Sequence, residues 1–325
     1  MADVVANGVR FNVSRLGQGE HTVVMLHGLV MDNLSSFYYT LANPIAREAE
    51  VILYDLRGHG RSERPPTGYT TEDAVADLDA LLTELGVDRP VHIIGNSYGG
   101  VVGLGMAVTH PERVAGLALI EAHFAVEGWG HHMAGSLALA AFGLAEDEVE
   151  QWLAEQGGRK INKMARNAES LIYETTMLDD LEAVQPLPRE ALAALACPVL
   201  AFYGEHSDLL DRARDLRDLV PDCDLRIFPG CTHSVLMEAT AELKATLLPW
   251  ILGQPVPAYP AAPESAIVPV VNPDWVADPR ERGRTTPLAA PEPTSPSAGT
   301  TETRVADLPG AADVTVAAAD PPAVD

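Results

Sequence analysis

Residues 91–100 read Val-His-Ile-Ile-Gly-Asn-Ser-Tyr-Gly-Gly, and this stretch decides the fold. An apolar run typical of a buried strand is followed at once by a segment, Tyr98 to Thr109, that we expect to be helical. A strand that enters a helix through one residue must turn sharply, and flanking glycines leave room for that turn. We therefore expect Ser97 to stand exposed at the carboxyl-terminal edge of a sheet, where a nucleophile would be accessible.

Apolar runs of similar length recur along the chain and alternate with helical stretches. They are almost continuously apolar, as strands buried on both faces require. Thr71 to Leu85 begins with the capping pattern Thr-Thr-Glu-Asp, and a helix over Ser234 to Leu252 is expected to end at Gly253. This alternation predicts an α/β fold, with a mostly parallel central sheet and helices on both faces. The other expected strands are 22–26, 51–54, 114–120, 199–203 and 225–228.

Residues 122–187 interrupt this alternation. No strand pattern is present there, whereas 146–155 and 168–184 are predicted to be helical. We expect a helical cap over one end of the sheet, inserted into a core formed by 1–121 and 188–253. Residues 254–325 are rich in Ala, Pro, Thr and Asp, and 14 of the 25 prolines lie in 255–325. This segment is predicted to be a disordered acidic tail.

Composition excludes several classes of function. There are 22 basic and 46 acidic residues, a formal charge of −24, so nucleic acid is not an expected partner. Cys197, Cys223 and Cys231 show no C-x-x-C spacing, so neither a disulfide framework nor a zinc site is expected, and no motif suggests a cofactor.

The same survey bears on location and assembly. The sequence shows no signal-peptide pattern and no apolar run long enough to cross a membrane, so we expect a cytoplasmic protein without a membrane span. The oligomeric state cannot be predicted from these features.

A serine hydroxyl is a weak nucleophile unless a base removes its proton. His233 is the candidate base, because its loop joins the last expected strand to the last helix and so lies at the same sheet edge as Ser97. Asp208 follows the preceding strand and is the preferred acid to orient that imidazole. Glu121, at the end of the strand 114–120, and Glu205 remain as alternatives.

Two backbone amides are expected to bind the oxyanion of the reaction. One belongs to Tyr98, directly after the proposed nucleophile, and the other to Leu29, in the turn His27-Gly28-Leu29. The His27 side chain is interpreted as structural. Residues 55–62, Asp-Leu-Arg-Gly-His-Gly-Arg-Ser, lack the spacing and lysine of a phosphate-binding loop and are interpreted as scaffold.

Taken together, these motifs resemble those of the α/β-hydrolase fold superfamily, in the order used by that family and over about residues 8–253. The resemblance implies the fold and serine chemistry, since a serine at position 97 disfavours the members with an aspartate nucleophile. The elbow is similar to that of meta-cleavage product hydrolases, although His27 to Asp32 replaces the glycine- and proline-rich loop of that group. The motifs are 27–29, 55–62, 95–100, 110–114, 203–208 and 231–238.

The expected function is hydrolysis of a small-molecule carboxylic ester or thioester through an acyl-enzyme. The expected partner is a small acyl substrate with an apolar portion, because the cap is rich in apolar side chains, although these can equally reflect ordinary packing. A carbon–carbon bond hydrolase and a non-enzymatic ligand-binding module are the alternatives. The cap side chains concerned are Phe124, Trp129, Met133 and Met177.

Overall fold

The structure is a computed structural model that describes residues 1–124, 126–144 and 158–259. The chain divides into two units, Met1–Ala266 and Ile267–Asp325. The predicted tail over 254–325 lies almost entirely outside the described residues, as does the helix predicted over 146–155. No helix among the described residues is long and apolar enough to cross a membrane.

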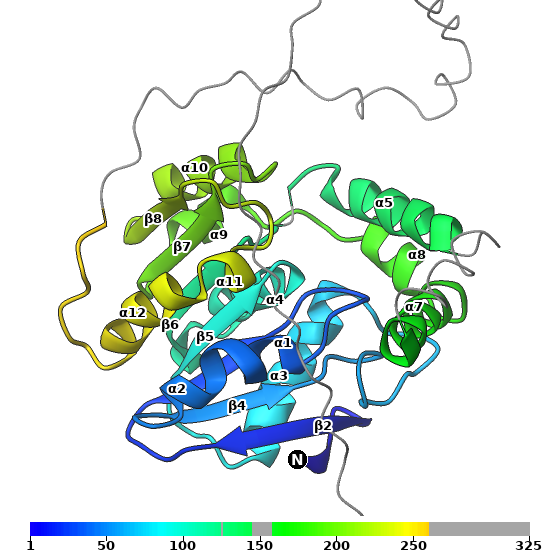
Figure 1. Cartoon of the computed structure of the whole chain (residues 1–325), viewed down its shortest axis with the longest axis horizontal. Helices are drawn as coiled ribbons and strands as arrows, with labels where there is room; N and C mark the ends of the chain where they lie inside the picture. The colour runs from blue at the N-terminus through cyan, green and yellow to red at the C-terminus, as the bar shows by residue number, and fades with distance from the viewer. Residues whose placement is uncertain (125, 145–157, 260–325) are drawn as a thin grey trace, which may run out of the picture. The chain divides into compact units, whose positions relative to one another are not determined.

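A mostly parallel eight-stranded sheet forms the centre of the first unit (Figure 1), which confirms the predicted α/β class. The strand order is β1-β2-β4-β3-β5-β6-β7-β8, and the pairs from β4 to β8 are all parallel. All six predicted strands are present, with ends that differ by at most two residues. They are β3 (Thr22–Leu26), β4 (Glu50–Tyr54), β5 (Val91–Asn96), β6 (Val114–Ile120), β7 (Val199–Gly204) and β8 (Cys223–Phe228).

Two strands at the amino terminus were not predicted. β1 (Ala2–Ala6) and β2 (Val9–Leu16) form an antiparallel hairpin that joins the sheet along β4. Asn7 and Gly8 make the turn, with φ of 47° and 74°. A two-residue turn of this type needs positive φ at both positions, which Asn-Gly supplies.

Helices pack on both faces of the sheet. α3 (Thr71–Glu84) and α4 (Tyr98–Thr109) cover one face. The segments α1 (Ser35–Phe37), η1 (Tyr38–Ala42) and α2 (Asn43–Ile45), with α11 (Val235–Glu238) and α12 (Thr240–Ile251), cover the other. α10 (Leu210–Leu219) packs on β7 and β8. α3 begins at the predicted capping box, in which Thr70 and Asp73 bond each other's backbone amides.

Between β6 and β7 the described chain is helical. α5 (Trp129–Leu144), α7 (Gly158–Tyr173) and α8 (Met177–Glu182) lie together in Figure 1, and α9 (Arg189–Ala193) leads into β7. The sequence predicted one helix over 168–184. The structure has α7 and α8 there, because the helical conformation is interrupted at 174–176. The Thr176 amide there bonds the Pro66 carbonyl oxygen, 2.9 Å away, and its hydroxyl bonds Asp180.

Candidate active site

Ser97 occupies a strained turn between β5 and α4. Its φ of 51° lies in the left-handed region, which a residue with a side chain rarely adopts. The glycines around it are required by contact: a Cβ on Gly99 would lie 2.0 Å from the Leu26 carbonyl oxygen, and one on Gly95 would lie 2.5 Å from the Gly100 nitrogen. The sharp turn predicted from 95–100 is present and holds Ser97 at the carboxyl end of β5.

The side chain of Glu121 is buried at the end of the neighbouring strand, β6. It is 0% exposed, and its backbone φ of 48° is also in the left-handed region. Its carboxylate accepts hydrogen bonds from the Gly204 amide and the Ser207 hydroxyl, and Oε2 lies 3.1 Å from His233 Nδ1. A buried carboxylate with this many donors is held rigidly and oriented toward the imidazole.

The structure thus pairs His233 with Glu121, where we preferred Asp208 from the sequence. Asp208 and Glu205 both follow β7, but Asp208 is exposed and Glu205 accepts the Gly230 amide at 3.0 Å. Among the hydrogen bonds of the described residues, none joins His233 to either of them. Asp208 still acts on the imidazole through its charge.

Two opposing effects set the pKa of His233. Burial disfavours the charged imidazolium, but the hydrogen bond and charge of Glu121, with the charge of Asp208, outweigh it and raise the pKa above the ordinary value. The side chain is 43% exposed, whereas the Glu121 side chain behind it is fully buried. A partly exposed imidazole with a buried carboxylate behind it suits proton transfer.

His123 connects the nucleophile turn to the base. Its backbone amide donates to the Ser97 carbonyl oxygen at 3.3 Å, and its ring lies with its centroid 5.5 Å from that of His233. Burial and the charge of His233 lower the pKa of His123 to about 4, although Asp208 opposes them. The ring is therefore neutral at pH 7. His123 thus contacts Ser97 through its backbone amide and lies beside His233 through its ring.

The amides of Leu29 and Tyr98 are available for an oxyanion. In the part of the chain that the structure describes, neither donates a hydrogen bond. The loop that carries Leu29 lies against Ser97, because a Cβ on Gly28 would be 3.4 Å from the Ser97 Cβ. Val30, the next residue, has a φ of 64° and donates its amide to His59 Nε2 at 2.8 Å.

Two buried histidines hold this loop in place. His27 Nε2 accepts the Leu56 amide at 2.9 Å, and burial lowers the pKa of His59 to about 3. Asp55 accepts the amides of Leu34 and Arg61. Residues 55–62 are thus engaged in supporting the Leu29 loop, in agreement with the interpretation of this motif and of His27 as scaffold.

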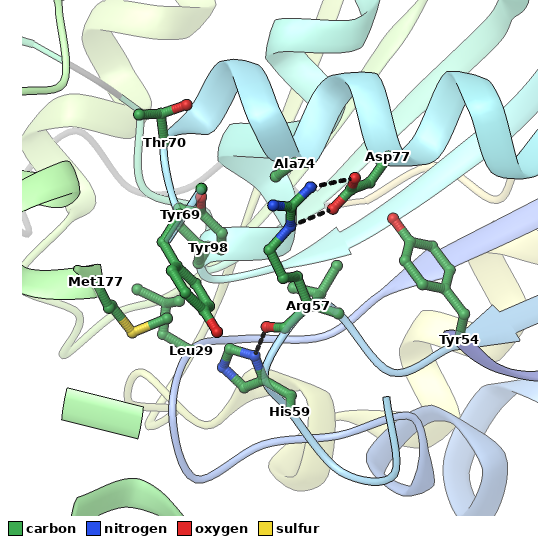
Figure 2. A pocket seen from close by; sticks show the side chains of 12 residues that line it. Leu29, Tyr54, Arg57, His59, Tyr69, Thr70, Ala74, Asp77, Tyr98 and Met177 are labelled. Carbon is green, nitrogen blue, oxygen red and sulfur yellow. Dashed lines mark hydrogen bonds and ion pairs between the residues drawn. The ribbon is translucent and has the colours of Figure 1, made fainter. Parts of the chain in front are cut away.

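A small pocket, with about 20 Å³ of free space, adjoins Leu29 and Tyr98 (Figure 2). Met177 of α8 and Tyr69 line it, together with the buried ion pair between Arg57 and Asp77. The other apolar side chains named from the segment 122–187 pack nearby. Trp129 stacks on Tyr98 with ring centroids 6.5 Å apart, and Phe124 and Met133 belong to the same apolar cluster. No group of His, Cys, Asp or Glu side chains suited to a metal ion is present in the described residues.

Comparison with known proteins identifies the family. A family model described as alpha/beta hydrolase fold matches residues 21–240, which is more than half of the chain. The chain belongs to the α/β-hydrolase fold family. One curated α/β hydrolase relative, the pimeloyl-[acyl-carrier protein] methyl ester esterase of Chromobacterium violaceum, is 30% identical over 68% of this chain and 90% of its own length.

Other members of the α/β-hydrolase family are also similar. The 2-hydroxymuconate semialdehyde hydrolase of Pseudomonas sp. (strain CF600) is 28% identical over 74% of this chain and 89% of its own length. Among solved structures, MGS-M2, an alpha/beta hydrolase enzyme from a Medee basin deep-sea metagenome library, superposes with a TM-score of 0.67 at 18% identity. The superposition covers 80% of this chain and 100% of the MGS-M2 chain. The relatives therefore include both esterases and meta-cleavage product hydrolases.

Two features of the site were missed by sequence reasoning. The left-handed conformations of Val30 and Glu121 carry no residue signal, because neither Val nor Glu is enriched there. The choice of Glu121 over Asp208 had a partial signal, since a Glu that directly ends an apolar strand is placed by the strand itself.

Proposed function

We propose that this α/β hydrolase is a serine hydrolase that cleaves a small carboxylic ester or thioester with an apolar acyl portion. The contact between Glu121 and His233, at the same sheet edge as the strained Ser97, carries the proposal. Ser97 is the proposed nucleophile, His233 the base and Glu121 the acid that orients the base. The esterase among the relatives supports the reaction class.

In the first half-reaction, His233 Nε2 takes the proton of the Ser97 hydroxyl while Oγ attacks the substrate carbonyl carbon. The carbonyl oxygen becomes negatively charged and is bound by the Leu29 and Tyr98 amides. His233 then gives its proton to the leaving alcohol or thiol as the carbon–oxygen or carbon–sulfur bond breaks. An acyl group on Ser97 remains.

In the second half-reaction, water replaces the alcohol. His233 takes one proton from the water as its oxygen attacks the acyl carbon, and the same two amides bind the oxyanion. Collapse of this intermediate returns the proton to Ser97 Oγ and releases the carboxylic acid. General-base assistance contributes about 10² to 10⁴-fold to each half-reaction.

Glu121 fits the role of the acid because it fixes the tautomer of His233. The carboxylate lies on the Nδ1 side, which leaves Nε2 for the proposed proton transfer with Ser97. Asp208 adds a second negative charge that stabilises the imidazolium from the exposed side. We assign Asp208 this electrostatic role and Glu121 the hydrogen-bonding role.

A fluorophosphonate probe and p-nitrophenyl acetate test the proposal together. The chain should be labelled at Ser97 and should hydrolyse the ester, whereas Ser97→Ala should lose both properties and keep its circular dichroism spectrum. Full activity in Ser97→Ala would overturn the mechanism. An unlabelled, inactive but folded chain would favour the alternative of a ligand-binding module.

Carbon–carbon bond hydrolysis is the second candidate, because a 2-hydroxymuconate semialdehyde hydrolase is among the relatives. The same triad would serve, with His233 driving ketonisation of a vinylogous diketone before its bond is broken. Turnover of a ring-fission product, compared with that of p-nitrophenyl acetate by the same preparation, separates the two reactions. Preference for the ester by orders of magnitude supports the first candidate.

A further inference from the structure

The imidazole of His233 receives little support from its own loop. The side chain is 43% exposed, and the flanking residues Thr232 and Ser234 are exposed as well. The hydrogen bond between Nδ1 and Glu121 fixes one edge of the ring, and the rotamer of the side chain otherwise depends on what packs against it. A displacement of about 1 Å can cost about 10²-fold in rate, so the other contacts of this ring bear on catalysis.

The ring of His123 packs against the ring of His233. Their centroids are 5.5 Å apart, and their planes are inclined at 56°. No hydrogen bond of the His123 ring is present in the part of the chain that the structure describes, so it meets His233 through its ring surface. With its pKa lowered to about 4, His123 stays uncharged when His233 takes a proton, and the two rings do not repel each other.

Trp129, the first residue of α5, supports His123 from behind. Its ring lies 6.1 Å from the His123 ring, centroid to centroid, and it stacks on Tyr98 at 6.5 Å with an interplanar angle of 8°. Tyr98, Trp129, His123 and His233 thus form a continuous aromatic row. The row begins at a residue whose amide is proposed to bind the oxyanion and ends at the proposed base.

The start of α5 is itself held in place. A Cβ on Gly130 would lie 2.0 Å from the Leu181 carbonyl oxygen, so α5 and α8 touch through their backbones there. α8 is joined to the core, because the Asp180 carboxylate accepts the Tyr69 amide at 2.8 Å. Trp129 therefore has support from Tyr98 on one side and, through α8, from the loop before α3 on the other.

Resting on the proposed function, in which His233 is the base, we infer that His123 is a positioning residue for it. The His123 ring, supported by Trp129, holds the His233 imidazole where Nδ1 bonds Glu121 and Nε2 serves Ser97. His123 acts through its ring surface and needs neither of its nitrogen atoms for this role. The chain that follows β6 thus contributes to the chemistry as well as to the surroundings of the substrate.

Two substitutions separate the ring of His123 from its nitrogen atoms. His123→Phe keeps an aromatic ring without hydrogen-bonding groups and should keep most of the wild-type kcat/KM on p-nitrophenyl acetate. His123→Asn keeps a hydrogen-bonding group without the ring and should lower kcat/KM by about 10 to 10²-fold, because the base is no longer held in place.

The two half-reactions distinguish positioning of the base from binding of the substrate. In His123→Asn, both the burst of p-nitrophenol and the steady-state rate that follows it should be slower, since the same base serves acylation and deacylation. The dissociation constant of the substrate, taken from the concentration dependence of the burst, should not change. An altered dissociation constant with unaltered rates would contradict the inference.

His92→Asn is the matched control. His92 is also a partly buried histidine with its pKa lowered to about 4, and its ring lies between those of His21 and Trp250, at 5.9 Å and 5.0 Å. It lies at the beginning of β5, whereas Ser97 follows the end of that strand. His92→Asn should therefore keep the wild-type kcat/KM, and thermal melts compare its stability with that of His123→Asn.

The wild-type protein tests the contact without any substitution, because nuclear Overhauser effects should join the ring protons of His123 and His233. Their absence would overturn the inference. So would full activity in His123→Asn, or a loss in His123→Phe as large as that in His123→Asn. Each of these results leaves the proposed function standing while wild-type Ser97 is labelled and the ester is hydrolysed. Failure of the wild-type protein in both assays would instead overturn the proposed function.

Discussion

His233 Nδ1 lies 3.1 Å from Oε2 of Glu121, a residue that directly follows a strand of the sheet. That strand, β6, pairs with β5 so that Ile120 is opposite Asn96, and the next residue on each strand is Glu121 or Ser97. The Ser97 amide also donates to the Ile120 carbonyl oxygen at 2.9 Å. The proposed nucleophile and acid are thus positioned by one pair of adjacent strands.

Glu121→Gln should lower kcat/KM by about 10² to 10⁴-fold, because an amide at this position would not stabilise the imidazolium and could favour the wrong tautomer. Asp208→Asn should lower it by less than about tenfold, since the contribution of Asp208 is electrostatic and partly screened by solvent. Steady-state kinetics on p-nitrophenyl acetate compare them. A greater loss in Asp208→Asn would return the role of acid to Asp208.

The pH profile of kcat/KM provides an independent test of the same pair. The reaction needs neutral His233, and its pKa is raised, so the acidic limb should lie above about pH 6.5, the ordinary value for histidine. Glu121→Gln removes the hydrogen bond and charge that raise this pKa, and the limb should move to lower pH. Asp208→Asn should shift it in the same direction by a smaller amount. An unmoved limb in both variants would contradict this account.

Stability should fall in mild acid because burial keeps three histidines neutral. The pKa is lowered to about 3 for His59 and to about 4 for His92 and His123, so between about pH 6.5 and 4 the unfolded chain binds more protons than the folded one. In this range each of these histidines lowers the free energy of unfolding by about 1.4 kcal/mol for every unit by which the pH falls. His233, with its raised pKa, contributes in the opposite direction. Denaturant unfolding at several pH values measures how the free energy of unfolding changes with pH. His92→Phe should reduce this slope by the contribution of about one bound proton.

Ser97→Gly should be more stable than Ser97→Ala by about 1 kcal/mol, although both are inactive. Position 97 has a φ of 51°, which glycine adopts without strain and alanine does not. Chemical denaturation of the two variants gives the difference. Equal stabilities would mean that the turn relaxes when the hydroxyl is removed.

Gly99→Ala should prevent folding or disrupt the turn, because the added Cβ would lie 2.0 Å from a backbone oxygen. Gly135→Ala is the matched control. Gly135 lies inside α5, where a Cβ would meet nothing within 4 Å, so alanine should be neutral or stabilising by about 0.5 to 1 kcal/mol. Soluble yield and thermal melts distinguish the two outcomes.

Much of the fold could be predicted from sequence because parallel strands buried on both faces leave an unmistakable apolar pattern. The β1–β2 hairpin was missed although Asn7-Gly8 is a strong turn signal, since its strands carry polar residues such as Asp3 and Arg10 among the apolar ones. The position of Ser97 followed from the strand and helix that flank it.

The carboxylate that contacts His233 was harder to predict. Chain order places Asp208 and Glu121 at the same sheet edge, and only side-chain direction separates them. That direction depends on the left-handed backbone at Glu121, together with the Gly204 amide and Ser207 hydroxyl that hold its carboxylate. These are tertiary contacts between residues more than eighty positions apart, which no local pattern encodes.

Glu121 directly follows β6, so the carboxylate nearest the imidazole is placed by the sheet, and the segment after β7 supports it from the other side. The Ser207 hydroxyl holds that carboxylate, and the His206 amide bonds the carbonyl oxygen of Cys231, two residues before His233. Insertions, tags or grafted sequences in 206–208 would therefore disturb the proposed base and acid together, so an engineer should leave this short exposed segment unchanged.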